Sequence, residues 1–140
     1  MIKKDCIFCK IINGELPSYN VYKDEDIIAF FDISLGNDFH TLVVPKKHYE
    51  NIFDIDEEIL AKLIKVTKKI CKEYEDKFGI EHINLVQSNG KFAGQEIFHY
   101  HMHILPRMKD DGNIFKFNID LNNDKRLSEN LIKVKGLINS

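Results

Sequence analysis

The spacing of apolar residues predicts short strands at the beginning of the chain. Three apolar or β-branched runs of this kind fall at residues 21–22, 27–32 and 41–44. The polar residues 23–26 form a turn that joins the first two strands into a hairpin. Pro45 has no backbone N–H to donate, so it is expected to end the third strand.

From residue 54 to residue 78 the period changes to that of an amphipathic helix. Its apolar side recurs in steps of three and four, at Leu60, Leu63, Ile64, Thr67, Cys71, Tyr74 and Phe78. Asp54, followed three residues later by Glu57, resembles a capping box. Gly79 stands where a left-handed residue would close the helix. The pattern therefore predicts one long helix of about six turns.

Two further strands are predicted after this helix, at residues 83–87 and 100–105, separated by the glycine-containing loop 88–95. Strands that come both before and after one long helix in the sequence indicate the α+β class. We expect a mostly antiparallel five-stranded sheet with the long helix on one face, and short helices in addition. After residue 107 the pattern weakens, and 126–138 is at best a short terminal helix. We expect one domain over 1–140, with its core at about 5–107 and a variable tail at 108–140.

Composition narrows the class of protein. The 140 residues carry a net charge of −2 and are 44% hydrophobic, as in one ordinary globular domain. No apolar run approaches the roughly 20 residues of a membrane-spanning helix, and residues 1–5 lack the features of a secretory signal, so we expect a cytoplasmic protein. The near-neutral charge predicts no nucleic-acid partner. Three cysteines, an odd number, argue against a disulfide framework and leave reduced thiols or a metal site.

Three histidines, His99, His101 and His103, alternate with apolar residues near the last predicted strand. On a strand, the imidazoles would share one face, while Phe98, Tyr100, Met102 and Ile104 would face the core. Such a row is compatible with a His-rich exposed strand, with a metal-binding tract or with an anion site. The preceding loop, with Gly94 and Gln95, favours the last, because it can bring N–H groups and an amide to an anion bound over the histidines.

A second motif, Cys6 and Cys9 in the spacing CxxC, lies near the start of the chain. Alone, it is compatible with redox activity, with metal binding or with two simple thiols. A structural zinc site requires four nitrogen or sulfur donors, so two further ligands would have to come from elsewhere in the chain.

Several separated blocks together resemble the histidine triad (HIT) family. They are His99-Tyr100-His101-Met102-His103-Ile104-Leu105, Cys6-Ile7-Phe8-Cys9, Gly14-Glu15-Leu16-Pro17, Phe30-Phe31-Asp32-Ile33 and the segment from His40 to His48. Within the family, the chain is similar to the nucleoside-phosphoramidate hydrolase branch and its bacterial relatives. The resemblance covers about residues 5–107. It implies the HIT-like fold and a homodimer in which the two sheets form one continuous sheet.

The resemblance also implies roles for the histidines. His101 matches the nucleophile that carries a nucleotidyl group on its ring, which suits a neutral imidazole at neutral pH. His103 matches the residue that contacts the phosphate oxygens, and Gln95 with neighbouring N–H groups would stabilise developing negative charge. His40 would orient the nucleophile's surroundings, although a buried histidine satisfied within the core would occupy the same position.

The nucleoside is expected in an apolar pocket beside the histidines. Asp32 matches the residue that accepts hydrogen bonds from the ribose hydroxyls, although an aspartate here would also begin a turn. Positions that match the family's base pocket are Ile7, Phe8, Ile11, Phe30, Phe31, Ile33 and Leu42. Positions near the phosphate are Ser88, Gly94, Gln95, Glu96 and Ile97. Two depart from the family pattern: Ser88 replaces an asparagine of many relatives, and Glu96 replaces a serine of some members.

In relatives with the CxxC motif, the remaining zinc ligands correspond to His48 and His99. The resemblance therefore implies one structural zinc ion held by Cys6, Cys9, His48 and His99, with no cofactor needed for the chemistry. The implied activity is hydrolysis of purine nucleoside phosphoramidates, or related adenylates, at the α-phosphorus. Two alternatives are a dinucleoside polyphosphate hydrolase and a nucleotide-binding regulatory module with little turnover.

Overall fold

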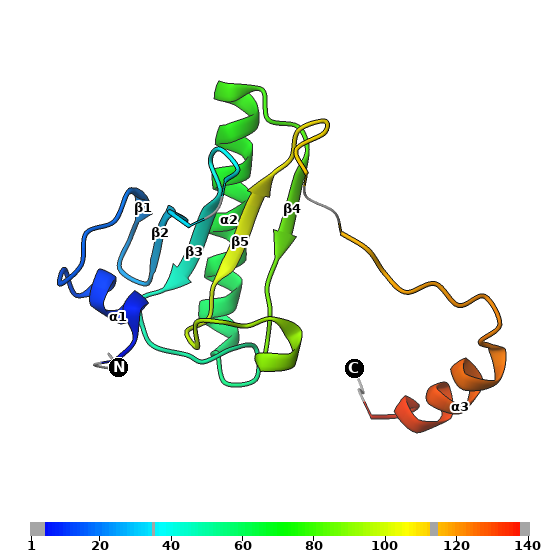
Figure 1. The fold of residues 1–140 in the computed structure, drawn as a ribbon. Coiled ribbons are helices and arrows are strands. Elements are labelled where there is room, and N and C mark those ends of the chain that lie inside the picture. Colours follow the sequence, from blue (N-terminus) through cyan, green and yellow to red (C-terminus); the bar gives the residue numbers. More distant parts are fainter. Residues whose placement is uncertain (1–4, 35, 113–114, 138–140) are drawn as a thin grey trace.

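The computed structural model describes residues 5–34, 36–112 and 115–137. The elements follow in the order α1 (Ile7–Ile12), β1 (Asn20–Lys23), β2 (Ile27–Phe31), β3 (Thr41–Pro45), α2 (Glu57–Phe78), β4 (Ile83–Val86), a single 3-10 turn η1 (Lys91–Ala93), β5 (Met102–Pro106) and α3 (Asp124–Val134). The five strands form one antiparallel sheet in the order β1-β2-β3-β5-β4 (Figure 1). The predicted α+β class is confirmed.

Both faces of the sheet are covered, which explains why the middle strands are buried almost throughout. On one side α2 packs against alternate residues such as Ile27, Ala29, Val43 and Ile104. On the other side Phe8 of α1 packs against the intervening residues of the strands, which are Ile28, Phe30, Leu42 and Val44. The two-residue period of a strand thus divides its side chains between two separate cores.

The long helix ends as its sequence predicts, but the residue that caps its start lies two positions later than the predicted cap. Gly79 closes α2 in the left-handed conformation, with φ of 67°. The predicted capping box at Asp54 is wrong, because the residue that precedes the helix is Asp56 and Glu57 is its first helical residue. The Asp54 carboxylate instead accepts hydrogen bonds from the backbone N–H groups of Glu50 and Asn51. It therefore stabilises the turn before the helix.

The last strand also begins later than predicted, at Met102 instead of Tyr100. The backbone N–H of Tyr100 donates to the carbonyl of Tyr49 at 2.7 Å, outside the sheet, so pairing with β3 starts further along the chain. Tyr100 and Ile104 are buried in the core as predicted, whereas Phe98 is 44% exposed. His101 accordingly lies just before the strand and His103 lies within it.

The later part of the tail, which carries the last helix, stands apart from the sheet (Figure 1). Its helix α3 has no buried residue, and its apolar side chains are exposed, among them Leu127, Leu131 and Ile132. The predicted terminal helix, 126–138, is observed at Asp124–Val134, and residue 138 lies outside the described residues. Within the described part of the chain, no helix combines the length and the apolar character needed to cross a bilayer.

Candidate active site

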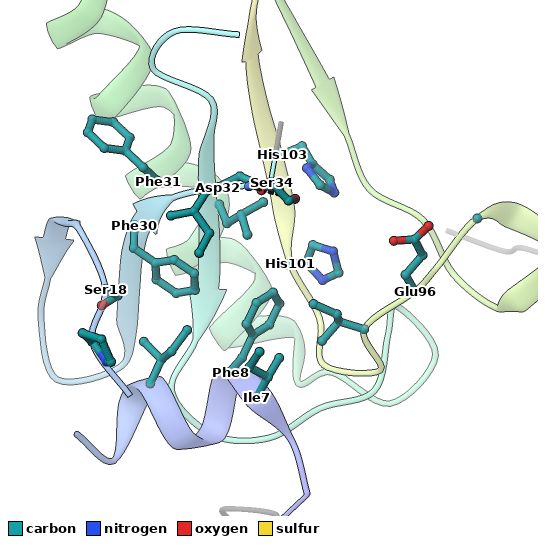
Figure 2. A pocket seen from close by; sticks show the side chains of 16 residues that line it. Ile7, Phe8, Ser18, Phe30, Phe31, Asp32, Ser34, Glu96, His101 and His103 are labelled. Carbon is teal, nitrogen blue, oxygen red and sulfur yellow. Dashed lines mark hydrogen bonds between the residues drawn. The ribbon is translucent and has the colours of Figure 1, made fainter. Parts of the chain in front are cut away.

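A cleft of 550 Å³ opens on the α1 side of the sheet, and it contains most of the residues predicted for nucleotide binding (Figure 2). Its walls come from α1, from β2 and β3, from the loop before β5 and from β5 itself. The lining residues are Ile7, Phe8, Ile11, Pro17, Ser18, Phe30, Phe31, Asp32, Ile33, Ser34, Leu42, Gly94, Glu96, Ile97, His101 and His103. Phe8 stands edge-on to both Phe30 and His101, with ring centroids 5.5 and 5.1 Å apart.

The ring of His101 is fixed in one tautomer by the backbone. Its Nδ1 lies 2.7 Å from the carbonyl oxygen of His99. A carbonyl oxygen only accepts, so Nδ1 carries the proton and donates it, and Nε2 of the neutral ring keeps a free lone pair. Burial lowers the pKa of His101, against the opposing effect of this hydrogen bond. The ring thus has the electronic state of a nitrogen nucleophile, and it lines the cleft.

His103, the next histidine in the cleft, is held by His40 from behind. His40 is only 3% exposed, and its Nε2 lies 2.9 Å from Nδ1 of His103. The centroids of the His101 and His103 rings are 5.0 Å apart. Burial lowers the pKa of His40, and it lowers the pKa of His103 to about 4. Both rings are therefore neutral at physiological pH.

The other nitrogen of His40 indicates which of these two rings donates the proton. His40 Nδ1 is buried and has no hydrogen-bond partner among the described residues. An unpaired buried N–H is less favourable than an unpaired lone pair, so we infer that the proton of His40 lies on Nε2 and is donated to His103 Nδ1. His103 then carries its own proton on Nε2. The cleft thereby receives a lone pair from His101 and an N–H donor from His103.

Asp32 makes the turn contact of its alternative role and keeps one oxygen available for its predicted role. Its Oδ1 accepts hydrogen bonds from the backbone N–H and the hydroxyl of Ser34, as a turn-forming aspartate does. Its other oxygen, Oδ2, has no hydrogen-bond partner among the described residues, and Asp32 lines the cleft. The carboxylate can therefore hold the turn and still accept a hydrogen bond from a ligand.

Gln95, in contrast, turns away from the cleft. Its Nε2 donates to the carbonyls of Glu50 and Ile97, and its Oε1 accepts from the N–H of Gly90 at 2.8 Å. The buried amide is thus committed to shaping the loop, and its neighbours Gly94 and Glu96 line the cleft in its place. Ser88 is also absent from the cleft wall. Pro17, Ser18 and Ser34 also line the cleft, although the sequence did not predict them as site residues.

The second predicted site, near the start of the chain, brings together residues that are far apart in the sequence. Single donor atoms of Cys6, Cys9, His48 and His99 all lie within 4.8 Å of one another. His99 Nδ1 is 3.3 Å from the sulfur of Cys6 and 3.5 Å from that of Cys9, and His48 Nδ1 is 3.3 Å from the sulfur of Cys9. Cys6 precedes the first turn of α1, and its sulfur accepts from the N–H of Cys9.

The donor set of this cluster fits a zinc ion. Two sulfur and two imidazole donors are a typical tetrahedral set for structural zinc. His99 Nε2 lies 2.8 Å from the carbonyl of Pro45 and must donate to it, so the Nδ1 lone pair faces the thiols. Burial lowers the pKa of His99 to about 4, which keeps that lone pair free. Because all four side chains are committed to this cluster, His101 and His103 remain separate from it.

A second cluster that could hold a metal consists of Asp32, His40 and His103. The hydrogen bond between its two histidines already uses one ligand nitrogen of each ring. We therefore assign these three residues to the cleft.

Comparison of the sequence with known proteins identifies a family for this chain. The HIT domain family matches residues 13–110. The chain is 49% identical to an uncharacterized HIT-like protein of Methanocaldococcus jannaschii, over 94% of this chain and 99% of that protein. It is 36% identical to the adenosine 5'-monophosphoramidase of Saccharomyces cerevisiae, over 73% of this chain and 62% of that enzyme.

Solved structures of HIT family proteins have the same fold as this chain. A HIT family protein from Bacillus anthracis superposes with a TM-score of 0.88 at 35% identity, covering 97% of this chain and 99% of that one. A zinc-bound histidine triad family protein from Mycobacterium smegmatis superposes with a TM-score of 0.74 at 29% identity, covering 96% and 98% of the two chains. From the sequence match, the fold and the paired histidines of the cleft, we conclude that this chain belongs to the HIT domain family.

Proposed function

We propose that this protein hydrolyses purine nucleoside phosphoramidates or related adenylates at the α-phosphorus, through a nucleotidyl group carried on His101. The observation that supports this most directly is the hydrogen bond from His101 Nδ1 to the His99 carbonyl, which leaves Nε2 as a nucleophile in the cleft. The adenosine 5'-monophosphoramidase among the relatives is consistent with this activity.

The reaction proceeds in two steps, transfer of the nucleotidyl group to His101 and its hydrolysis by water. The lone pair on His101 Nε2 forms a bond to phosphorus while the bond from phosphorus to the leaving group breaks. The electron pair of that bond goes to the leaving nitrogen, which takes a proton from solvent and departs as an amine. Water then attacks phosphorus, the bond to Nε2 breaks, and the nucleoside monophosphate is released with loss of a proton to solvent. His103 Nε2–H donates to a phosphate oxygen in both steps.

The nucleoside is bound by burial of its base and by the carboxylate of Asp32. Phe8, Phe30 and Leu42 present flat and branched apolar surface, which suits a planar ring. Asp32 accepts a hydrogen bond from the ribose hydroxyls. Such a pocket selects a base mainly by its size and shape, which favours purines as a class.

Zinc has a structural role in this proposal. Held by Cys6, Cys9, His48 and His99, the ion would fix the start of α1 to the sheet and take no part in phosphoryl transfer. The three cysteines are free thiols, as expected in the reducing cytoplasm, where we place the protein.

We also propose a homodimer, formed through the edge strand β4 and the exposed side of α2. Leu85 of β4 is 48% exposed, and Ile64 and Phe78 of α2 are 44% and 56% exposed. An edge strand with exposed apolar residues is a natural site for pairing with a second copy. Light scattering during gel filtration would give twice the mass of one chain, and a single-chain mass would contradict the dimer.

The decisive experiment uses an adenosine phosphoramidate as substrate and measures release of the monophosphate. We expect His101→Ala to lower kcat by at least about 10³-fold, because no other ring can form the intermediate. His82→Ala is the matched control, since His82 is exposed and outside the cleft, and it should retain the parent rate. Equal turnover by His101→Ala and the parent would refute the proposal.

The same assay separates the two alternatives. A dinucleoside polyphosphate hydrolase would turn over diadenosine polyphosphates faster than the phosphoramidate. A regulatory module would bind adenosine monophosphate in the cleft but turn over neither substrate.

A further inference from the structure

The cleft has an unusual charge for a site that handles phosphate. Among its lining residues there is no lysine and no arginine, while two carboxylates, Asp32 and Glu96, are present. Asp32 belongs to the nucleoside end. Glu96 therefore places a second negative charge in the cleft, and the proposed nucleoside contacts do not use it.

Glu96 lies at the far side of His101 from the base pocket. Figure 2 shows its carboxylate turned towards the His101 ring, while Phe30 lies on the opposite side of that ring. The side chain is exposed and has no hydrogen bond or ion pair with any described residue. A nucleotide whose base lies against Phe30 would therefore direct its leaving group towards Glu96.

A second, smaller cavity of 270 Å³ continues from this point. It shares Ile7, Glu96 and Ile97 with the main cleft and adds Asp5, Cys6, His48 and Phe98. Asp5 supplies another carboxylate without a partner among the described residues. Phe98 and Ile97 supply apolar surface to the same cavity as the two acids. A zinc ion with two thiolates and two neutral imidazoles has no net charge, so metal binding would not cancel this acidity.

We propose that Glu96 and Asp5 form a leaving-group subsite for amines that carry a second, cationic amino group on an apolar stem. This inference rests on the proposed function, because it concerns the group that departs from the phosphorus. The second ammonium group lies near the two carboxylates, and its methylene stem lies on Ile97 and Phe98. Leaving groups with negative charge, such as polyphosphates or carboxylates, are repelled.

The expected size of this selectivity follows from the exposure of the acids. A charge pair about 4 Å apart contributes about 1 kcal/mol near water, which is roughly five-fold in an equilibrium or rate ratio. Attraction raises kcat/KM for a substrate with a cationic leaving group, and repulsion lowers it for one with an anionic leaving group. The two effects multiply, so the ratio of the cationic to the anionic kcat/KM should reach about 10-fold to 30-fold. Because the acids are exposed, the ratio should shrink as ionic strength rises.

Three adenosine 5'-phosphoramidates of equal chain length test the subsite, with 1,4-diaminobutane, butylamine and 4-aminobutyrate as leaving amines. We would measure kcat/KM for each, and calorimetric Kd values in parallel, with the parent and with Glu96→Gln, Asp5→Asn and Glu58→Gln. Glu58 is the matched control, since it is an exposed acid on α2 outside both cavities.

The expected order for the parent is diamine, then butylamine, then aminobutyrate. Glu96→Gln should reduce the cationic-to-anionic ratio by at least about five-fold, Asp5→Asn by less, and Glu58→Gln should leave it unchanged. An unchanged ratio in Glu96→Gln, or equal treatment of the three compounds by the parent, overturns the subsite. Charge-ordered Kd values without hydrolysis would refute the proposed function and support the subsite. Failure to bind any of the three would refute both.

Discussion

The neutral state of His103 predicts a specific loss of stability in mild acid. Burial holds the pKa of this ring at about 4, against about 6.5 in the unfolded chain. Between these values the unfolded state binds more protons than the folded state, so stability falls as the pH falls from about 6.5 through about 4. From about pH 7.5 to about pH 5, the two pKa values give a loss of about 2 kcal/mol. This is an upper value, because the ring is partly exposed and water screens its charge.

The assay is urea unfolding followed by far-ultraviolet circular dichroism at both pH values, for the parent and for His103→Gln. Glutamine cannot titrate, so the variant should lose about 1–2 kcal/mol less than the parent on acidification. Histidines elsewhere contribute to both proteins and largely cancel. Equal losses, within about 0.5 kcal/mol, would show that His103 is as free to take a proton when folded as when unfolded.

Three further predictions concern other parts of the molecule. Cys9→Ser should reduce zinc content measured by elemental analysis and lower the Tm, whereas Cys71→Ser, outside the cluster, should keep its zinc; full occupancy in Cys9→Ser would contradict the site. His40→Phe removes the donor to His103 and should lower kcat/KM for a phosphoramidate by about 10-fold or more, with unchanged circular dichroism. Tyr74→Phe should cost about 1 kcal/mol in urea unfolding, because the Thr41 hydroxyl donates to the Phe39 carbonyl and must accept from Tyr74; no change would mean that this buried bond adds nothing.

The periodicity of apolar residues in the sequence was sufficient to predict the main strands and the long helix. Strands 27–31 and 41–45 and the helix at 57–78 lie within a few residues of their predicted ranges, because each has its own repeat of apolar residues. The boundaries depended on partners that are distant in sequence. Asp54 and Asp56 are equally good caps by type, but in the folded chain Asp54 accepts from backbone N–H groups of the preceding turn, and Asp56 accepts from the Tyr49 hydroxyl without capping the helix through its side chain.

In the candidate site, too, local sequence patterns predicted some features, while others depend on residues that are distant in the sequence. Alternation placed His101 and His103 in one cleft, but their tautomers depend on a carbonyl and on His40, which no local pattern indicates. Cys9 lies 39 residues from His48 and 90 from His99, so CxxC alone could not identify these partners, and the family resemblance did. The inward turn of the Gln95 amide follows from contacts with Glu50 and Gly90, which only the folded loop provides.

The short helix α1 carries Phe8 into the wall of the cleft, while Cys6 and Cys9 at its first turn belong to the cluster with His48 and His99. A helix of six residues is not stable by itself, so the position of Phe8 depends on the contacts that Cys6 and Cys9 make at the start of α1. Oxidising the two thiols, or fusing a purification tag ahead of Asp5, would therefore disturb ligand affinity at a distance. Preparations should carry their tags at the other terminus and be handled with reductant from lysis onward.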